Sequence, residues 1–264
     1  MAQIHPGAFV DAGAKLADDV VVGPGAVIEA GVAVGARGRV GPHAVLHRGT
    51  TLADEVTVAV GAVIGGAPQD VKFSGGESGV TIGPQTVIRE YATVHRCSEP
   101  GAVTRVGADC MLMATSHVAH ECVLGDGVIL ANGATLAGHV TLADGVFVSG
   151  HAQIHQFVRA GPLVMIGGGS KVLKDLPPYC VADGHPARLF GLNSIGLRRA
   201  AFAPERVQAI KEAYRTLFGA GVQLEAALTS LDRLGRNGNP SAAEFAAFVR
   251  ASERGIARPG RSGG

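Results

Sequence analysis

Aliphatic side chains recur at every sixth position through most of the chain. The series runs over residues 4–64 and 82–172 and loses its phase only at Asp70, Gly76 and Pro100. A period of six fits neither the 3.6-residue turn of an α-helix nor the two-residue alternation of a strand, but it is typical of a parallel β-helix. We therefore predict a left-handed parallel β-helix, in which three hexads make one coil of a triangular prism.

Small or β-branched side chains follow each aliphatic position by four residues, as at Ala26, Val56, Ala62 and Ser116. They let the chain turn a corner, so that coils of eighteen residues stack at the strand spacing of about 4.8 Å with the aliphatic side chains inside.

Breaks in the repeat divide the chain. The hexads resume in register after two segments, which we expect to be external loops, and loops on a regular scaffold usually carry function. After the last hexads, three amphipathic segments are bounded by glycine and proline, and they predict helices over 203–218, 222–234 and 239–256. The expected organisation is a catalytic β-helix at 1–180 with loops at 65–79 and 98–104, a connecting segment at 181–196, a helical domain at 197–256 and a disordered tail at 257–264.

Composition agrees with a solenoid, since glycine reaches 39 residues, tryptophan is absent and only 17% of residues are charged. No apolar run approaches the ~18 residues of a membrane-spanning segment, and the first residues lack the features of a signal peptide, so we expect a cytoplasmic protein. The net charge of +1 gives no reason to expect nucleic acid binding. Basic side chains outnumber acidic ones after Arg188, which favours an acidic partner at that end.

The four cysteines contain no CxxC pair. Cys110 and Cys122 lie twelve residues apart on a repeat position that small residues occupy elsewhere. We interpret both as buried structural side chains and not as nucleophiles or metal ligands.

Histidines gather in the middle of the repeat. His120 precedes His139 by nineteen residues and His155 by thirty-five, each within one residue of a whole number of coils. The three should therefore lie near one another on one face, beside Asn132 and Gln156. Neutral imidazoles in such a column can act as base, orienter and phosphate donor near pH 7. The same histidines also fit a zinc site, as in β-helices that resemble carbonic anhydrases, or solvated side chains on a non-catalytic scaffold.

The chain also carries longer motifs, namely QDVKFSG (69–75), TSHVAHEC (115–122), ILANGATLAGHV (129–140), HQF (155–157) and FGLNSIGLRR (190–199). Together they resemble one enzyme family, the UDP-N-acetylglucosamine 3-O-acyltransferases of lipid A synthesis, and the resemblance covers nearly the whole chain. It implies transfer of a 3-hydroxyacyl group from acyl carrier protein to a UDP-amino sugar. It also implies a homotrimer of parallel prisms with active sites between neighbours, and neither a cofactor nor a metal.

The resemblance assigns the general base to His120. Glu121, where the family commonly has aspartate, is expected to hold the imidazole, and the backbone N–H of Gly138 to face the developing oxyanion. A sugar hydroxyl is a weak nucleophile at neutral pH and a thioester is an activated donor, so removal of the hydroxyl proton is sufficient and no covalent acyl-enzyme is needed.

Substrate contacts follow from the same resemblance. Gln69, Asp70 and Lys72 in the first loop are expected to bind the sugar and stabilise the attacked intermediate. The remaining substrate contacts, including those to the nucleotide and its diphosphate, are expected from His117, His139, His155, Gln156, Asn193 and Arg199. The length of the acyl groove is expected to depend on Met165, Gly168 and Pro186.

Four positions depart from the family pattern: Cys97, Ile195, Ala200 and Pro186. They touch acceptor contacts and the acyl groove, so the sequence indicates the reaction class more firmly than the sugar. The 3-amino analogue of UDP-N-acetylglucosamine therefore stays open as an alternative acceptor, which would be N-acylated.

Overall fold

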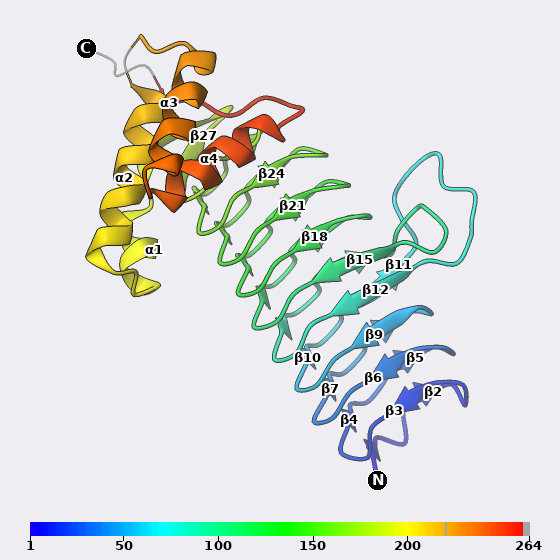
Figure 1. Ribbon diagram of the computed structural model, residues 1–264. Helices are drawn as coiled ribbons and strands as arrows, with labels where there is room; N and C mark the ends of the chain where they lie inside the picture. The colour runs from blue at the N-terminus through cyan, green and yellow to red at the C-terminus, as the bar shows by residue number, and fades with distance from the viewer. Residues whose placement is uncertain (220, 261–264) are drawn as a thin grey trace.

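The computed structural model describes residues 1–219 and 221–260 and is a triangular prism of stacked coils with helices packed at its C-terminal end (Figure 1). Each coil gives one short strand to each of three parallel sheets. Most neighbouring strands pair eighteen residues apart, as in Leu130↔Val148 and Leu136↔Ile154. The predicted coil of three hexads is therefore confirmed.

From β1 to β26 the strands enter the three sheets in turn, and β27 and β28 both extend the first sheet. The first sheet holds β1 (Gln3–Ile4), β4 (Val21–Val22), β7 (Arg39–Val40), β10 (Thr57–Val58), β13 (Val87–Ile88), β16 (Met111–Leu112), β19 (Ile129–Leu130), β22 (Phe147–Val148), β25 (Met165–Ile166), β27 (Cys180–Gly184) and β28 (Ala187–Leu192). The second sheet holds β2 (Phe9–Val10), β5 (Val27–Ile28), β8 (Val45–Leu46), β11 (Val63–Gly66), β14 (Thr93–His95), β17 (His117–Val118), β20 (Thr135–Leu136), β23 (Gln153–Ile154) and β26 (Lys171–Val172). The third holds β3 (Lys15–Leu16), β6 (Ala33–Val34), β9 (Thr50–Leu52), β12 (Gly79–Ile82), β15 (Val103–Val106), β18 (Val123–Leu124), β21 (Thr141–Leu142) and β24 (Arg159–Ala160).

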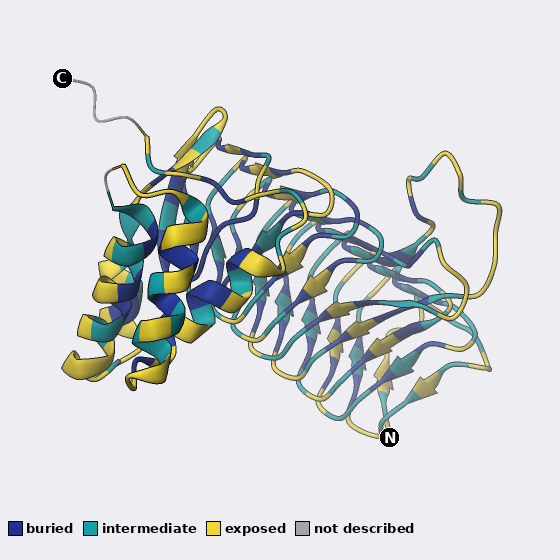
Figure 2. Cartoon of the chain, turned by 45° about the horizontal axis from the view of Figure 1, so that its top comes forward, coloured by how far each residue is buried: buried dark blue, intermediate teal, exposed yellow. Residues whose placement is uncertain are grey.

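The repeated aliphatic residues fill the prism, as expected. Ile28, Leu46 and Leu130 are fully buried, and Figure 2 shows buried positions, in dark blue, recurring along the coils that follow the first. The N-terminal end is less buried. Ile4, the first aliphatic residue of the repeat, is 45% exposed, and Val10 and Leu16 are only partly buried.

The long connections leave the prism at one edge, where each strand of the second sheet turns into the next strand of the third. We call it the loop edge. It carries residues 67–78 between β11 and β12 and residues 96–102 between β14 and β15, close to the two loops expected from the sequence. The tight turns after β17, β20 and β23 stack along the same edge.

Four helices follow the β-helix: α1 (Ser194–Arg199), α2 (Pro204–Phe218), α3 (Leu224–Arg236) and α4 (Pro240–Arg250). The last three fall within or close to the predicted segments, and they bury a second core that includes Ile210, Leu231 and Phe245. Tyr179 joins this core to the prism, since its hydroxyl donates to Glu244 at 2.7 Å. No helix in the described ranges is long and apolar enough to cross a membrane.

The C-terminal third differs from expectation in three places. Residues 181–196 are largely an antiparallel hairpin of β27 and β28 followed by the start of α1, instead of a plain connection. The third predicted helix ends at Arg250, because the chain then returns to the prism, where the amide of Ala257 donates to the Asp175 carbonyl at 2.8 Å. Residues 257–260 of the expected disordered tail continue this pairing, while 261–264 lie outside the described residues.

Candidate active site

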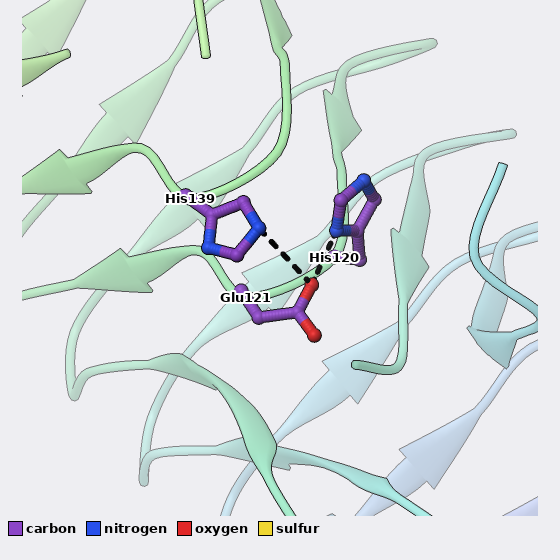
Figure 3. A group of neighbouring side chains, drawn as sticks. All are labelled: His120, Glu121 and His139. Carbon is purple, nitrogen blue, oxygen red and sulfur yellow. Dashed lines mark hydrogen bonds and ion pairs between the residues drawn. The ribbon is translucent and has the colours of Figure 1, made fainter. Parts of the chain in front are cut away.

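His120 and Glu121 lie side by side in the turn after β17, on the loop edge (Figure 3). Their side chains are 14% and 11% exposed, and His120 Nδ1 is hydrogen-bonded to Glu121 Oε2. A carboxylate partner places the imidazole proton on Nδ1, which leaves the lone pair of Nε2 free to accept another proton. The pair therefore has the arrangement of a general base and its orienting carboxylate.

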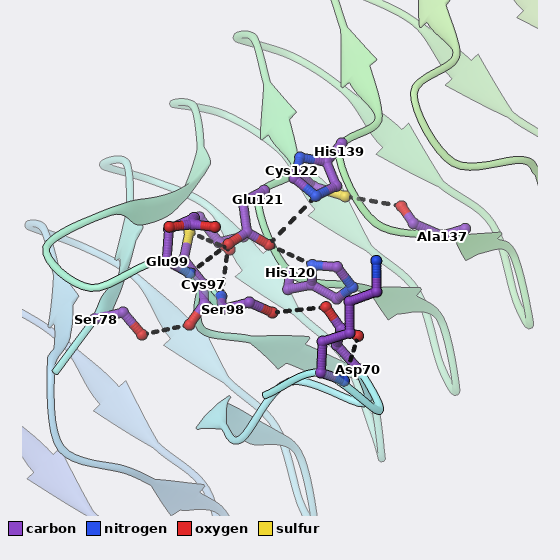
Figure 4. Close-up of polar contacts among 12 residues, drawn as sticks. Asp70, Ser78, Cys97, Ser98, Glu99, His120, Glu121, Cys122, Ala137 and His139 are labelled. Atoms are coloured by element: carbon purple, nitrogen blue, oxygen red, sulfur yellow. Dashed lines mark hydrogen bonds and ion pairs between the residues drawn. The ribbon is translucent and has the colours of Figure 1, made fainter. Parts of the chain in front are cut away.

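The second loop holds the other end of the Glu121 carboxylate. Oε1 accepts hydrogen bonds from the backbone amides of Ser98 at 2.6 Å and Glu99 at 2.9 Å (Figure 4). Two successive amides aimed at one oxygen stabilise negative charge. Glu121 thus links the second loop to the imidazole of His120, a role for Ser98 and Glu99 that the sequence did not suggest.

The first loop reaches the same cluster through Asp70. Its Oδ1 accepts from the Lys72 amide at 2.9 Å, and its Oδ2 lies 3.5 Å from Ser98 Oγ. The Lys72 amide lowers the pKa of Asp70, and the nearby charges of His120 and Lys72 lower it further. Asp70 and Lys72 lie in the first loop, and the Asp70 carboxylate is at the edge of the histidine cluster, with Gln69 exposed beside them.

Coil stacking brings Gly138 against His120. The pairing His117↔Thr135 puts residue 138 next to residue 120 on the following coil. A Cβ at position 138 would lie 2.5 Å from Cε1 of the His120 ring, so only glycine leaves room for the imidazole. Within the described residues the Gly138 amide makes no hydrogen bond, and it is free to donate to a substrate oxygen.

His139 completes the cluster one coil further on. Its Nε2 lies 3.9 Å from Glu121 Oε2, and its ring meets that of His120 edge to face at 5.3 Å. Its other neighbour is Phe157, whose ring stacks on it at 4.4 Å. His155, expected in this column, is exposed and bonds through Nδ1 to the Gln156 carbonyl at 3.1 Å. The sequence analysis missed Phe157, although it follows His139 by one whole coil of eighteen residues.

His117 lies in strand β17, next to a histidine that the sequence did not single out. Its Nδ1 is 2.8 Å from Thr93 Oγ1, and its ring meets His95 at 4.8 Å. Burial is the main cause that lowers the pKa of His117, to about 4, and the neighbouring histidines add to it. Burial also lowers the pKa of His95. Both rings are therefore neutral at pH 7.

The other predicted site residues lie away from the loop edge. Met165 is in β25, and Gly168 is in the turn from the first sheet to the second. Asn193 is the N-cap of α1, and its Nδ2 donates to the carbonyl oxygen of Leu163, on a different edge, at 2.8 Å. Arg199 is exposed at the end of α1. Pro186 lines a separate pocket together with Lys174, Arg188, Ala187, Leu173 and Ile256 to Arg258. A single chain therefore does not bring these residues to His120.

The cysteines are all buried, as the sequence predicted for Cys110 and Cys122. Burial raises the pKa of Cys122 to about 12, which disfavours the thiolate. Among the described residues, one group of three side chains could hold a metal ion, namely His120, Glu121 and His139, whose ligand atoms lie within 4.8 Å of one another.

Two family models match parts of the chain. Residues 175–257 match the second domain of UDP-N-acetylglucosamine O-acyltransferases. Residues 1–36 and 104–138 match the hexapeptide repeat of bacterial transferases.

Whole-chain comparisons agree with these matches. An acyl-[acyl-carrier-protein]–UDP-N-acetylglucosamine O-acyltransferase of Alkalilimnicola ehrlichii is 44% identical over 98% of this chain and 100% of its own length. The enzyme of the same name from Myxococcus xanthus is 42% identical over the same shares. Among solved structures, the UDP-N-acetylglucosamine acyltransferase of Francisella novicida superposes with a TM-score of 0.94 at 32% identity, covering 98% of this chain and 95% of its own. LpxA of Acinetobacter baumannii gives 0.92 at 36% identity, covering 97% and 99%.

These likenesses extend from the first coil to the C-terminal helices, and they confirm the left-handed parallel β-helix expected from the repeat. The chain belongs to the family of acyl-[acyl-carrier-protein]–UDP-N-acetylglucosamine O-acyltransferases.

Proposed function

We propose that this chain moves a 3-hydroxyacyl group from acyl carrier protein to the 3-hydroxyl of UDP-N-acetylglucosamine, the first step of lipid A synthesis, with His120 as general base. The supporting observation is the His120–Glu121 pair, in which the carboxylate is bonded to Nδ1 and leaves Nε2 free. The relatives are named for this donor and this acceptor.

In this mechanism Nε2 of His120 takes the proton of the sugar hydroxyl while the oxygen attacks the thioester carbonyl. Glu121 stabilises the resulting imidazolium, and the Gly138 amide donates to the oxyanion of the tetrahedral intermediate. The carbon–sulfur bond then breaks, and the departing thiolate takes the proton back from the imidazolium. Proton and charge both balance, and no acyl-enzyme forms.

Substrate contacts in this proposal come from more than one chain. Gln69, Asp70 and Lys72 hold the sugar at the loop edge, with His117, His139, His155 and Gln156 along the same side of the prism. Asn193 and Arg199 lie near a different edge and would come from a neighbouring copy, as would Met165 and Gly168. A homotrimer of parallel prisms places different edges of adjacent chains in one cleft.

The C-terminal part of the chain is the surface that would receive an acidic acyl carrier protein. Arg188, Arg198, Arg199, Lys211 and Arg215 are exposed there. Opposite charges across such a contact would steer association. The cytoplasmic location expected from the sequence belongs to the same proposal.

A transfer assay tests the function directly. The purified chain is incubated with a panel of 3-hydroxyacyl carrier proteins and either UDP-N-acetylglucosamine or its 3-amino analogue, and the products are identified by mass. An O-acylated product is expected. A product only from the amino analogue would favour the alternative acceptor, and no product from any pair would contradict the acyltransferase proposal.

A further inference from the structure

His120 Nδ1 and His139 Nε2 face the same oxygen of Glu121 (Figure 3). From this convergence we infer that the three side chains form a binding site for a divalent transition-metal ion such as Zn²⁺, and that the bound ion inhibits the enzyme. The donor set is two imidazole nitrogens and one carboxylate oxygen. This set suits zinc, which binds such atoms at about 2.0–2.2 Å in tetrahedral geometry.

The donor atoms of the three side chains already lie within 4.8 Å of one another. Atoms bound to one tetrahedral zinc ion lie about 3.3 Å apart, given the bond lengths above. The distance from His139 Nε2 to Glu121 Oε2 is 3.9 Å and would shorten by a few tenths of an ångström. The closer contact between His120 and Glu121 would open to admit the ion. A water molecule would take the fourth position.

Neighbouring groups already fix two of the three ligands, which lowers the entropy lost when the ligands are ordered around an ion. Glu121 Oε1 is fixed by the amides of Ser98 and Glu99, and the His139 ring is stacked on Phe157. Such outer contacts orient metal ligands and strengthen binding. His139 is the most exposed of the three at 37%, so the ion would enter from its side.

Occupancy would remove the base, and this part of the inference rests on the proposed function. The ion takes the lone pair of His120 Nδ1, so the single proton of the neutral ring moves from Nδ1 to Nε2. With the metal on Nδ1, Nε2 carries this proton and has no lone pair to accept the proton of the sugar hydroxyl. Glu121 can no longer stabilise an imidazolium, because its oxygen is also bound to the ion. The acceptor hydroxyl then keeps its proton.

Cobalt provides a direct measure of binding, because Co²⁺ in a tetrahedral site absorbs visible light far more strongly than in an octahedral one. We expect the full-length protein to bind one Co²⁺ per chain with tetrahedral absorption, and Zn²⁺ to displace it. His139→Gln should weaken binding at least tenfold. The control is His43→Gln, which removes an exposed histidine on another edge and should change nothing.

Glu121→Gln is a second test in case His139→Gln fails to fold, as judged by circular dichroism. Unchanged cobalt affinity in the folded variants, or octahedral absorption alone, would overturn the site. Acyl transfer assayed with and without saturating Zn²⁺, then with a chelator, tests the inhibition. Full activity of the zinc-bound enzyme would refute it, whereas an inactive metal-free enzyme that still binds cobalt would refute the proposed function and leave the metal site standing.

Discussion

At the scale of single residues, the site depends on which nitrogen of His120 carries a proton. The ring is bonded to Glu121 on one side and lies against Gly138 on the other. It contributes little to the hydrophobic interior, which the repeated aliphatic residues fill. A substitution of His120 should therefore lower the catalytic rate without lowering the stability of the fold.

We expect His120→Ala to lower the transfer rate by about 10²–10⁴-fold, the usual contribution of a general base. The melting temperature and oligomeric state should stay as in the wild type. His43→Ala is the matched control, since His43 is exposed on another edge, and it should keep full activity. More than a tenth of the wild-type rate in His120→Ala would show that another group takes the proton.

His117 predicts how stability responds to acid. The pKa of His117 is about 4 in the folded chain, against an ordinary value of 6.5. Between these two pH values the unfolded chain binds a proton at this histidine and the folded chain does not. Stability should therefore fall as the pH drops from 6.5 toward 4. At about 1.4 kcal/mol per pKa unit, the full effect is on the order of 3 kcal/mol.

Urea unfolding at pH 7.5 and 5 measures this effect. His117→Gln should lose less stability between the two values than the wild type, whereas His155→Gln, which removes an exposed histidine, should behave as the wild type. Equal acid sensitivity in wild type and His117→Gln would contradict the assignment.

At the scale of loops and turns, the second loop positions the catalytic pair. Glu121 spans from His120 to the amides of Ser98 and Glu99, and an aspartate is one methylene too short to keep all three contacts. Although aspartate is the residue that the family commonly has, we expect Glu121→Asp to slow transfer at least tenfold here. One hydrogen bond to a charged group contributes about 1.5–3 kcal/mol.

The pH dependence of kcat distinguishes positioning from simple loss of structure. In Glu121→Asp the rate should fall and the acidic limb of the pH profile should move, while thermal stability changes little. An unchanged rate and profile would mean that the loop and His120 are not coupled through Glu121.

The turn after β25 predicts the preferred acyl length. A Cβ at Gly168 would meet only the Gly150 carbonyl oxygen, at 3.5 Å, so a larger side chain fits there and would project outward. If this turn borders the acyl groove, Gly168→Met should close its end and shift the preference to shorter donors. Each buried methylene is worth about 0.8 kcal/mol, roughly fourfold in selectivity. Donor profiles measured on one acceptor test this, and an unchanged length optimum would place the end of the groove elsewhere.

These turns also show what the sequence could and could not predict. The repeat predicted the coils because every sixth side chain points inward, and it located both loops because the register resumes after them. Counting in steps of eighteen residues correctly predicted that His139 lies near His120. It also predicted His155 at the place where the structure has Phe157, because a count made without the strand pairing can be wrong by a residue or two. Ser98 and Glu99 contact Glu121 through their backbone amides. Almost any residue type could supply such an amide, so the sequence does not reveal these contacts.

At the scale of the whole molecule, the predicted site residues lie on different edges of the prism. His120 is on the loop edge, Gly168 is on the edge between the first and second sheets, and Asn193 bonds to the turn between the third and first. One chain cannot fold these edges together, because the coils between them are rigidly packed.

We therefore expect a C3 homotrimer in solution, measured by light scattering coupled to size exclusion. Co-assembly provides a further test: mixing His120→Ala subunits with Asn193→Ala subunits should restore part of the activity, since some clefts would then combine an intact residue from each. An active monomer would rule out a shared site.

The exposed N-terminal coil is the end of the prism at which local unfolding should begin. A repeat protein opens most easily where a coil has one neighbour instead of two, and here Ile4, an inward position of the repeat, is 45% exposed. The opposite end is sealed by the second core and by Tyr179. Fraying should advance from the first coil, and amide exchange should slow along the chain toward the middle. The coil that holds His120 and Glu121 lies several coils away from this end. It should therefore stay folded when the first coils open.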